Sequence, residues 1–110
     1  DTAMVYVPDH GESLGENGLY LHAAPYAIAP RAQTHVPMVM WMSPGAARDW
    51  GVDTACLAAR RDEPYSHDNL FHSFLGMFEV RTDVYKQQLD LLAPCRAAVE
   101  ARAGKGGPRG

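Results

Sequence analysis

The residues best suited to chemistry lie together near the start of the chain, in the run Asp9-His-Gly-Glu-Ser13. Asp9 offers a carboxylate oxygen and His10 an imidazole nitrogen, and both donors bind borderline divalent cations such as zinc. Gly11 allows the backbone to approach such a centre closely. Zinc takes about four ligands, so Asp9 and His10 complete at most half of a site. A bare Asp-His pair is more often a turn cap beside a solvated histidine, and the pair alone does not decide between these interpretations.

The strand and loop around this run place it where many proteins bind ligands. The segment from Ala3 to Val7 is continuously apolar, which predicts a short strand covered on both faces in a parallel sheet. Pro8 ends the strand, and polar residues dominate the following loop from Asp9 to Gly18. Ligands of open α/β sheets bind at the carboxyl ends of strands. The loop is therefore a candidate binding loop.

The remaining pattern predicts one more strand and two clear helices. The apolar segment from Val36 to Met42 predicts a second core strand, whereas Tyr20 to Pro30 has no clean period and predicts irregular structure. Thr54 to Arg61 predicts a short helix, and Ser66 is a good N-cap for a longer one. The apolar face of that longer helix consists of Leu70, Phe71, Phe74, Leu75 and Phe78. The fold class is α/β, as a fragment, because so few strands and helices cannot close a doubly wound sheet.

Two histidines of the longer helix receive structural interpretations. His67 precedes Leu70 and Phe71 by about one helical turn, so we expect a core histidine with satisfied hydrogen bonds rather than a ligand. His72 points away from the apolar face, so we expect it in solvent.

Length and composition exclude several classes of protein. The chain has 110 residues, of which 46% are apolar and 21% charged, as in a small globular domain. Its formal net charge of −3 gives no indication of binding to nucleic acid or to an anionic membrane surface. No apolar segment approaches the ~20 residues that a membrane helix requires.

The two ends of the chain differ in character. The chain opens at Asp1, almost inside the first predicted strand, so its start looks cut from a longer protein. Residues 104–110 are rich in glycine and basic, without apolar anchors, and they predict a disordered tail.

The chain has two cysteines, Cys56 and Cys95, with no CxxC spacing. A zinc finger is therefore unsupported. The pair could be two separate buried thiols or one disulfide, and a disulfide would indicate an oxidising compartment. The cysteine count alone does not choose between them.

Several longer strings carry a specific family resemblance. The strings are Asp9-His-Gly-Glu-Ser-Leu-Gly-Glu-Asn-Gly-Leu-Tyr-Leu-His22, Pro25-Tyr-Ala-Ile-Ala-Pro30, Gln33-Thr-His-Val-Pro37, Ser66-His-Asp-Asn-Leu-Phe-His72 and Asp90-Leu-Leu-Ala-Pro-Cys-Arg96. Together they resemble the lipid A phosphoethanolamine transferases, which include the mobile colistin-resistance enzymes. The likeness covers nearly all of residues 3 to 96.

This resemblance implies a C-terminal fragment of an alkaline-phosphatase-like (sulfatase) three-layer α/β fold. Residues 1–103 would be the C-terminal part of a periplasmic catalytic domain, held at the bacterial inner membrane by N-terminal helices that this chain lacks. Such enzymes use zinc and transfer phosphoethanolamine from phosphatidylethanolamine to a lipid A phosphate, through a covalent intermediate on threonine. The resemblance does not say which lipid A phosphate is modified, whether a second zinc binds or whether polymyxin resistance results.

The family match also assigns roles to individual residues. Asp9 and His10 become zinc ligands, while Glu12 and His22 become substrate-binding residues on the phosphoryl side. The nucleophilic threonine is expected upstream, so this chain holds no catalytic nucleophile and is expected to be inactive alone. A periplasmic location favours a disulfide between the two cysteines.

Two residues depart from the family pattern. Pro8 replaces a small polar residue and removes a backbone donor, and Ala23 replaces a glycine and disfavours a positive φ. We expect both to be tolerated.

Two other classes stay open beside the transferase. The first is another phosphodiesterase, sulfatase or glycerophosphotransferase of the same superfamily, in which Asp9 and His10 keep their role. The second is an inactive truncated product. The long string that ends at His22 favours the transferase over the other enzymes.

Overall fold

The computed structural model describes residues 1–96, which form two compact units. Residues 3–42 make up the N-terminal unit, and residues 1–2 with 43–96 make up the C-terminal unit. The predicted tail of residues 104–110 and the last part of the predicted domain, residues 97–103, lie outside the described residues. Within residues 1–96, no helix has the length and apolar character needed to cross a membrane.

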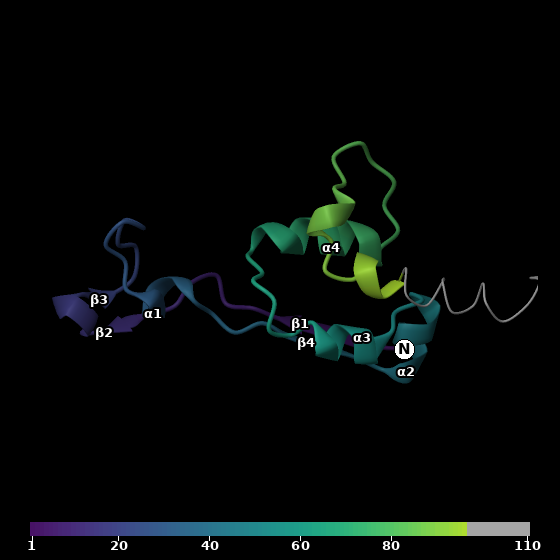
Figure 1. Ribbon diagram of the computed structural model, residues 1–110, viewed down its shortest axis with the longest axis horizontal. Coiled ribbons are helices and arrows are strands. Elements are labelled where there is room, and N and C mark those ends of the chain that lie inside the picture. The colour runs from purple at the N-terminus through teal and green to yellow at the C-terminus, as the bar shows by residue number, and fades with distance from the viewer. Residues whose placement is uncertain (97–110) are drawn as a thin grey trace, which may run out of the picture. The chain divides into compact units, whose positions relative to one another are not determined.

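Two strands form the base of the N-terminal unit. β1 (Ala3–Tyr6) and β4 (Val39–Met42) lie side by side and pair antiparallel, with Ala3 opposite Met42 and Tyr6 opposite Val39 (Figure 1). Both strands fall inside the segments predicted for them. The expected parallel arrangement is wrong for this pair.

One face of this two-stranded sheet is open. The side chains on it are half-exposed, between 46% and 54%, and come from Met4, Tyr6, Val39 and Trp41. Side chains on the opposite face are more covered. The prediction that both faces are buried is therefore wrong for residues 1–96, although apolar residues on both faces are what a doubly covered strand requires.

A small hairpin and a short helix complete the N-terminal unit. β2 (Ser13–Leu14) pairs antiparallel with β3 (Tyr20–Leu21), and the 3-10 turn η1 (Glu16–Gly18) connects them. Leu14 N donates a 2.7 Å hydrogen bond to the Glu16 carboxylate. Backbone N–H groups of Glu16 and Leu14 lower the pKa of the Glu16 carboxyl. The helix α1 (Arg31–Thr34) has only four residues. Apart from β3, residues 20–30 are irregular, as predicted.

The C-terminal unit begins with two short capped helices. Ser43 Oγ accepts from Ala46 N at 3.1 Å and caps α2 (Pro44–Asp49). Asp53 Oδ1 accepts from Ala55 N at 3.0 Å and caps α3 (Thr54–Ala59). The predicted helix at Thr54 is confirmed, and it ends two residues earlier than expected.

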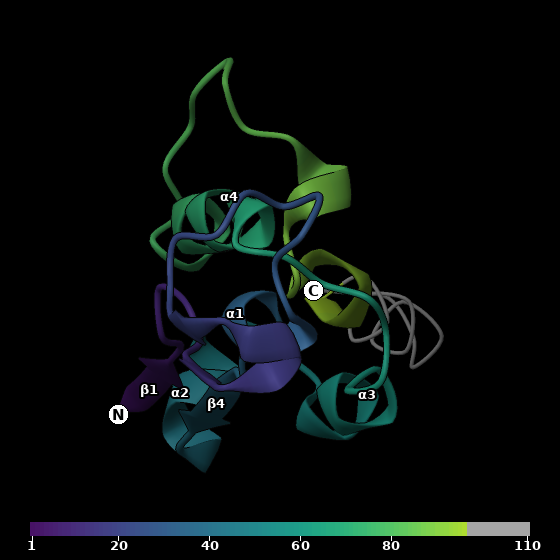
Figure 2. The same cartoon turned by 90° about the vertical axis from the view of Figure 1, so that its left-hand side faces the viewer.

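The longest helix, α4 (Asp68–Met77), is also confirmed, but its buried face differs from the prediction. Its buried residues are His72, Ser73 and Met77, whereas Phe71, Phe74 and Phe78 are 40% to 69% exposed. The 3-10 turn η2 (Gln87–Leu89) returns beside α4, as Figure 2 shows. The returning chain covers the polar side of the helix, because Lys86 N donates to His72 Nδ1 at 3.0 Å and Leu91 N donates to Ser73 Oγ at 2.8 Å.

Both histidine interpretations are wrong. His72 is buried rather than solvated, and His67 is exposed rather than a core residue. The N-cap position of the helix is His67 rather than the predicted Ser66, although Ser66 Oγ accepts from Asp68 N at 3.2 Å.

A disulfide and a buried carboxylate hold the end of this unit. Cys56 and Cys95 are bonded, with Cα atoms 5.5 Å apart, which confirms the predicted bridge. Asp90 Oδ2 accepts from Tyr85 Oη at 2.7 Å and from the Arg96 guanidinium, and Asp90 Oδ1 accepts from Leu92 N at 2.8 Å. Burial, together with the neighbouring Asp90 carboxylate, raises the pKa of the Tyr85 hydroxyl.

Candidate metal and phosphate site

The loop after β1 is held against the short helix α1 by backbone contact. Gly11 N donates a 2.9 Å hydrogen bond to Gln33 O. A Cβ atom at Gly11 would lie 1.9 Å from Ala32 O, so no larger residue fits without moving the backbone. Gly11 was expected to allow close approach to a metal, and the structure shows that the close approach is to α1.

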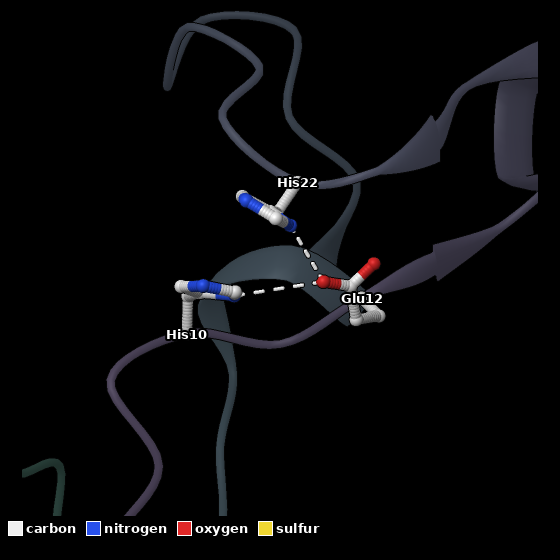
Figure 3. Close-up of side chains that lie close together, drawn as sticks. All are labelled: His10, Glu12 and His22. Atoms are coloured by element: carbon white, nitrogen blue, oxygen red, sulfur yellow. Dashed lines mark hydrogen bonds and ion pairs between the residues drawn. The ribbon is translucent and has the colours of Figure 1, made fainter.

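Three side chains, two from this loop and one from the residue directly after β3, converge at one point (Figure 3). Donor atoms of His10, Glu12 and His22 all lie within 4.8 Å of one another. Glu12 Oε1 lies 2.6 Å from His22 Nδ1 and 3.9 Å from His10 Nδ1. The two imidazole rings stack with centroids 4.1 Å apart. Two imidazoles and one carboxylate are a donor set that zinc accepts.

The hydrogen bonds of His10 fix which nitrogen is available. Its Nδ1 lies 2.9 Å from Gly11 O, and since a carbonyl oxygen only accepts, Nδ1 carries the proton. In the neutral ring this leaves a lone pair on Nε2. That nitrogen lies 3.7 Å from Asp9 Oδ2, so both atoms can face one cation.

Asp9 also has a local role. Its side chain is 89% exposed, and its Oδ1 accepts from His10 N at 3.1 Å. This bond joins adjacent residues, so it does not cap a turn. A carboxylate has two oxygens, and Oδ2 remains available to a metal.

His22 is oriented by the Glu12 carboxylate. Because the carboxylate accepts, His22 Nδ1 carries the proton and Nε2 faces away from Glu12. The structure therefore brings all four predicted site residues into one region, with Asp9 next to His10 and Glu12 next to His22. The division into metal ligands and substrate-binding residues stays a prediction.

The backbone on either side of His22 is strained. Leu21 and Ala23 have φ values of 64° and 70°, in the left-handed region that non-glycine residues rarely adopt. An alanine disfavours a positive φ, as the sequence indicated for Ala23, yet Ala23 adopts one. Strain of this kind persists where surrounding contacts impose it, and it is frequent at functional sites.

Two buried polar residues, Ser13 and Gln33, were missed as site components. They are 2% and 5% exposed and bond to each other at 2.8 Å. Both residues lie in the strings that carry the family resemblance. They follow no periodic pattern of apolar residues, so no sequence pattern indicated that their side chains are buried.

Comparison with known proteins places this geometry in a family. The family model for sulfatases matches residues 1–80. Phosphoethanolamine transferase EptA of Salmonella typhimurium is 51% identical over 100 residues, covering 90% of this chain and 18% of that protein. Phosphatidylethanolamine transferase Mcr-1 of Escherichia coli is 39% identical over 88 residues, covering 80% of this chain and 15% of that protein.

A solved structure supports the same relationship. The soluble domain of lipooligosaccharide phosphoethanolamine transferase A from Neisseria meningitidis matches with a TM-score of 0.81 at 51% identity, covering 86% of this chain and 29% of that domain. The structure of the same enzyme as an integral membrane protein matches with a TM-score of 0.80 and is covered to 18%.

These likenesses confirm the predicted fold class, a partial α/β fold of the sulfatase type. The chain spans less than a fifth of the length of the two relatives compared by sequence. The family match and the shared fold show that the chain belongs to the sulfatase family, in which it resembles the phosphoethanolamine transferases.

Proposed function

We propose that this chain supplies part of the active site of a zinc-dependent enzyme that transfers phosphoethanolamine from phosphatidylethanolamine to a lipid A phosphate. The observation that carries the proposal is the convergence of His10, Glu12 and His22, with Asp9 beside His10. The names of the similar proteins support the transferred group and the donor, and the Neisseria relative supports a lipid-linked saccharide as acceptor.

The residues present fit a zinc ion. Asp9 Oδ2 and His10 Nε2 would hold it, with the remaining ligands from the rest of the enzyme. Bound zinc would offset the negative charge of phosphoryl oxygens and lower the pKa of a hydroxyl nucleophile. We assign that nucleophile to a threonine upstream of this chain, as the family resemblance implies.

Glu12 and His22 act on the substrate side. Glu12 holds the His22 ring through Nδ1, so that Nε2 can bind a phosphoryl oxygen as a hydrogen-bond donor when the ring is protonated. The carboxylate stabilises the imidazolium charge that this donation requires. The pair therefore orients the phosphoryl group and supplies a proton close to it.

We place the enzyme at the bacterial inner membrane, with this part in the periplasm. The Neisseria relative is described as an integral membrane protein with a soluble domain. The Cys56–Cys95 disulfide is the bond expected of a protein matured in an oxidising compartment.

The test uses the parent protein, expressed from its full reading frame, with a fluorescent phosphatidylethanolamine analogue as donor and lipid A as acceptor. Transfer is followed by mass spectrometry of lipid A, and bound zinc by elemental analysis. Asp9→Ala is expected to lose zinc and transfer together. His22→Ala is expected to retain zinc and to lower kcat by about 10²-fold, the scale of a lost proton-transfer group.

His35→Ala is the matched control, because His35 is an exposed histidine of the same unit outside the cluster. Full zinc occupancy in Asp9→Ala would remove Asp9 from the metal, and unchanged turnover in His22→Ala would remove His22 from the site. Release of free phosphoethanolamine to water, without modified lipid A, would instead indicate a hydrolase of the same family. The isolated chain is expected to bind zinc weakly, because it holds only part of the ligand set.

A further inference from the structure

Gln33 occupies a central place in the N-terminal unit, although it belongs to neither proposed ligand pair. It lies on α1, is 5% exposed, and bonds to three residues in two segments through one main-chain atom and two side-chain atoms. Its carbonyl accepts from Gly11 N at 2.9 Å. Its Nε2 donates to Ser13 Oγ at 2.8 Å, and its Oε1 accepts from Ala24 N at 3.1 Å.

The three partners of Gln33 flank the three members of the cluster. Gly11 lies between His10 and Glu12, and Ser13 directly follows Glu12. Ala24 follows His22 by two residues. One glutamine therefore ties the segment that carries His10 and Glu12 to the segment that carries His22.

The contact to Ala24 also bears on the strain beside His22. Ala23 has a φ of 70°, and the next N–H along the chain is the one that Gln33 Oε1 accepts. A left-handed alanine relaxes unless its neighbours prevent it. The hydrogen bond to Gln33, together with the pairing of Leu21 with Ser13, holds the turn in place.

The burial of the Gln33 and Ser13 side chains makes these bonds hard to replace. A buried amide or hydroxyl that loses its partner is not compensated by water. The loop thus has one arrangement that satisfies both side chains, and that arrangement brings the imidazole rings of His10 and His22 to 4.1 Å.

We propose that Gln33 is a positioning residue that sets the spacing between the His10–Glu12 segment and His22. This proposal rests on the proposed function, in which Asp9 and His10 bind the metal and Glu12 and His22 bind the phosphoryl group. The spacing would keep these two pairs at a fixed distance from each other. The hydrogen bonds of Gln33 described above go to neither pair. Gln33 acts by fixing the two backbones from which the pairs project.

The test is made on the folded 110-residue chain, with Gln33→Met as the main variant, because methionine has a similar length but cannot hydrogen-bond through its end. Two readouts are used. The first, measured without metal, is the nuclear Overhauser effect between the ring protons of His10 and His22. The second is the affinity for Zn²⁺ by calorimetry. Thr34→Val is the matched control, because Thr34 lies on the same helix and is exposed.

Gln33→Met is expected to lose the contact between the His10 and His22 rings. Its affinity for Zn²⁺ is expected to change little, because the proposed metal ligands Asp9 and His10 are adjacent residues and the main-chain bond from Gly11 N to Gln33 O is kept. The cross-strand contacts of β1 and β4 are expected to remain, and Thr34→Val to behave as the wild type. Gln33→Glu keeps an acceptor for Ala24 N and for the Ser13 hydroxyl, so it is expected to restore the ring contact. A ring contact that is unchanged in Gln33→Met would overturn the proposal.

Two further outcomes test the positioning role of Gln33. If Gln33→Met disrupts β1 and β4, Ser13→Ala replaces it, because that change removes one side-chain bond only. A weakened ring contact in Ser13→Ala supports the proposal, and an unchanged one overturns it. If the parent protein shows no loss of zinc in Asp9→Ala while Gln33→Met of the chain still loses the ring contact, the metal assignment of the proposed function fails and the positioning role of Gln33 stands.

Discussion

The N-terminal and C-terminal units of this chain are stabilised internally by different interactions. Among the described residues, the buried hydrophobic side chains fall in the C-terminal unit, apart from Met42: Ala46, Ala47, Val52, Met77, Leu91, Leu92, Ala93 and Cys95. The C-terminal unit also has the disulfide. The N-terminal unit holds the candidate site and relies on buried hydrogen bonds, chiefly those of Ser13 and Gln33.

This contrast shows where stability and chemistry reside in the molecule. A unit with a buried apolar core and a covalent bridge tolerates the loss of one polar contact, whereas a loop-rich unit with little buried apolar area depends on each of its hydrogen bonds. The chemistry is placed on the second kind of structure, where donors from distant segments can converge.

The chain's two tryptophans allow the contrast to be measured. Trp41 lies in β4 of the N-terminal unit, and Trp50 follows α2 in the C-terminal unit. Trp50→Phe leaves a reporter for the first unit, and Trp41→Phe leaves one for the second. Denaturant titrations of these two backgrounds report the units separately.

The largest effect is expected from removing the disulfide. Replacing Cys56 and Cys95 together with alanine opens a loop across a separation of 39 residues and is expected to lower the free energy of unfolding at Trp50 by about 4 kcal/mol. The Trp41 reporter is expected to change far less. Reduction of the wild type with dithiothreitol is the matched control and should give the same midpoint. Equal shifts at both tryptophans would break the contrast between the units.

The next effect concerns the buried carboxylate of the C-terminal unit. The Asp90 side chain is 0% exposed and pairs with the Arg96 guanidinium. Asp90→Asn leaves that cation without its partner and is expected to lower the free energy of unfolding at Trp50 by about 3 kcal/mol. Asp62→Asn is the control, because the Asp62 side chain is 93% exposed and its pair with Arg61 should contribute less than about 1 kcal/mol. Similar losses in both variants would show that burial of Asp90 has no special weight.

The smallest effect is a gain in the N-terminal unit. Ala23→Gly relieves the positive φ and is expected to raise the free energy of unfolding at Trp41 by about 0.5–1 kcal/mol. Ala27→Gly provides the comparison, because Ala27 lies in the nearby turn without a positive φ and should be neutral or slightly destabilised. A loss of stability in Ala23→Gly would mean that the turn is not strained.

Several strands, helices and site residues could be predicted from the sequence, because they depend on patterns of neighbouring residues. The strands at Ala3 and Val39, the helix that follows Ser66 and the loop that begins at Asp9 follow from short-range patterns of apolar residues and prolines. The cysteine pairing followed from the family resemblance. Asp9, His10, Glu12 and His22 were named as site residues, and the structure brings them together.

The features that were missed depend on contacts between distant residues. The helical period of α4 marks its apolar side but not the side that the returning segment covers, so His72 was expected in solvent. The direction of β1 relative to β4 is set by pairing across more than 30 residues, which a strand pattern does not encode. Gln33 was overlooked because its three partners lie 9 to 22 positions away and share no spacing rule.

The open face of the β1–β4 pair affects how the chain behaves at high concentration. Met4, Tyr6, Val39 and Trp41 present adjacent apolar side chains on a short sheet, and exposed apolar sheets promote association between molecules. We therefore expect this chain to associate as its concentration in solution is raised. A single charge on that face, as in Trp41→Lys, would be expected to raise the solubility of the chain.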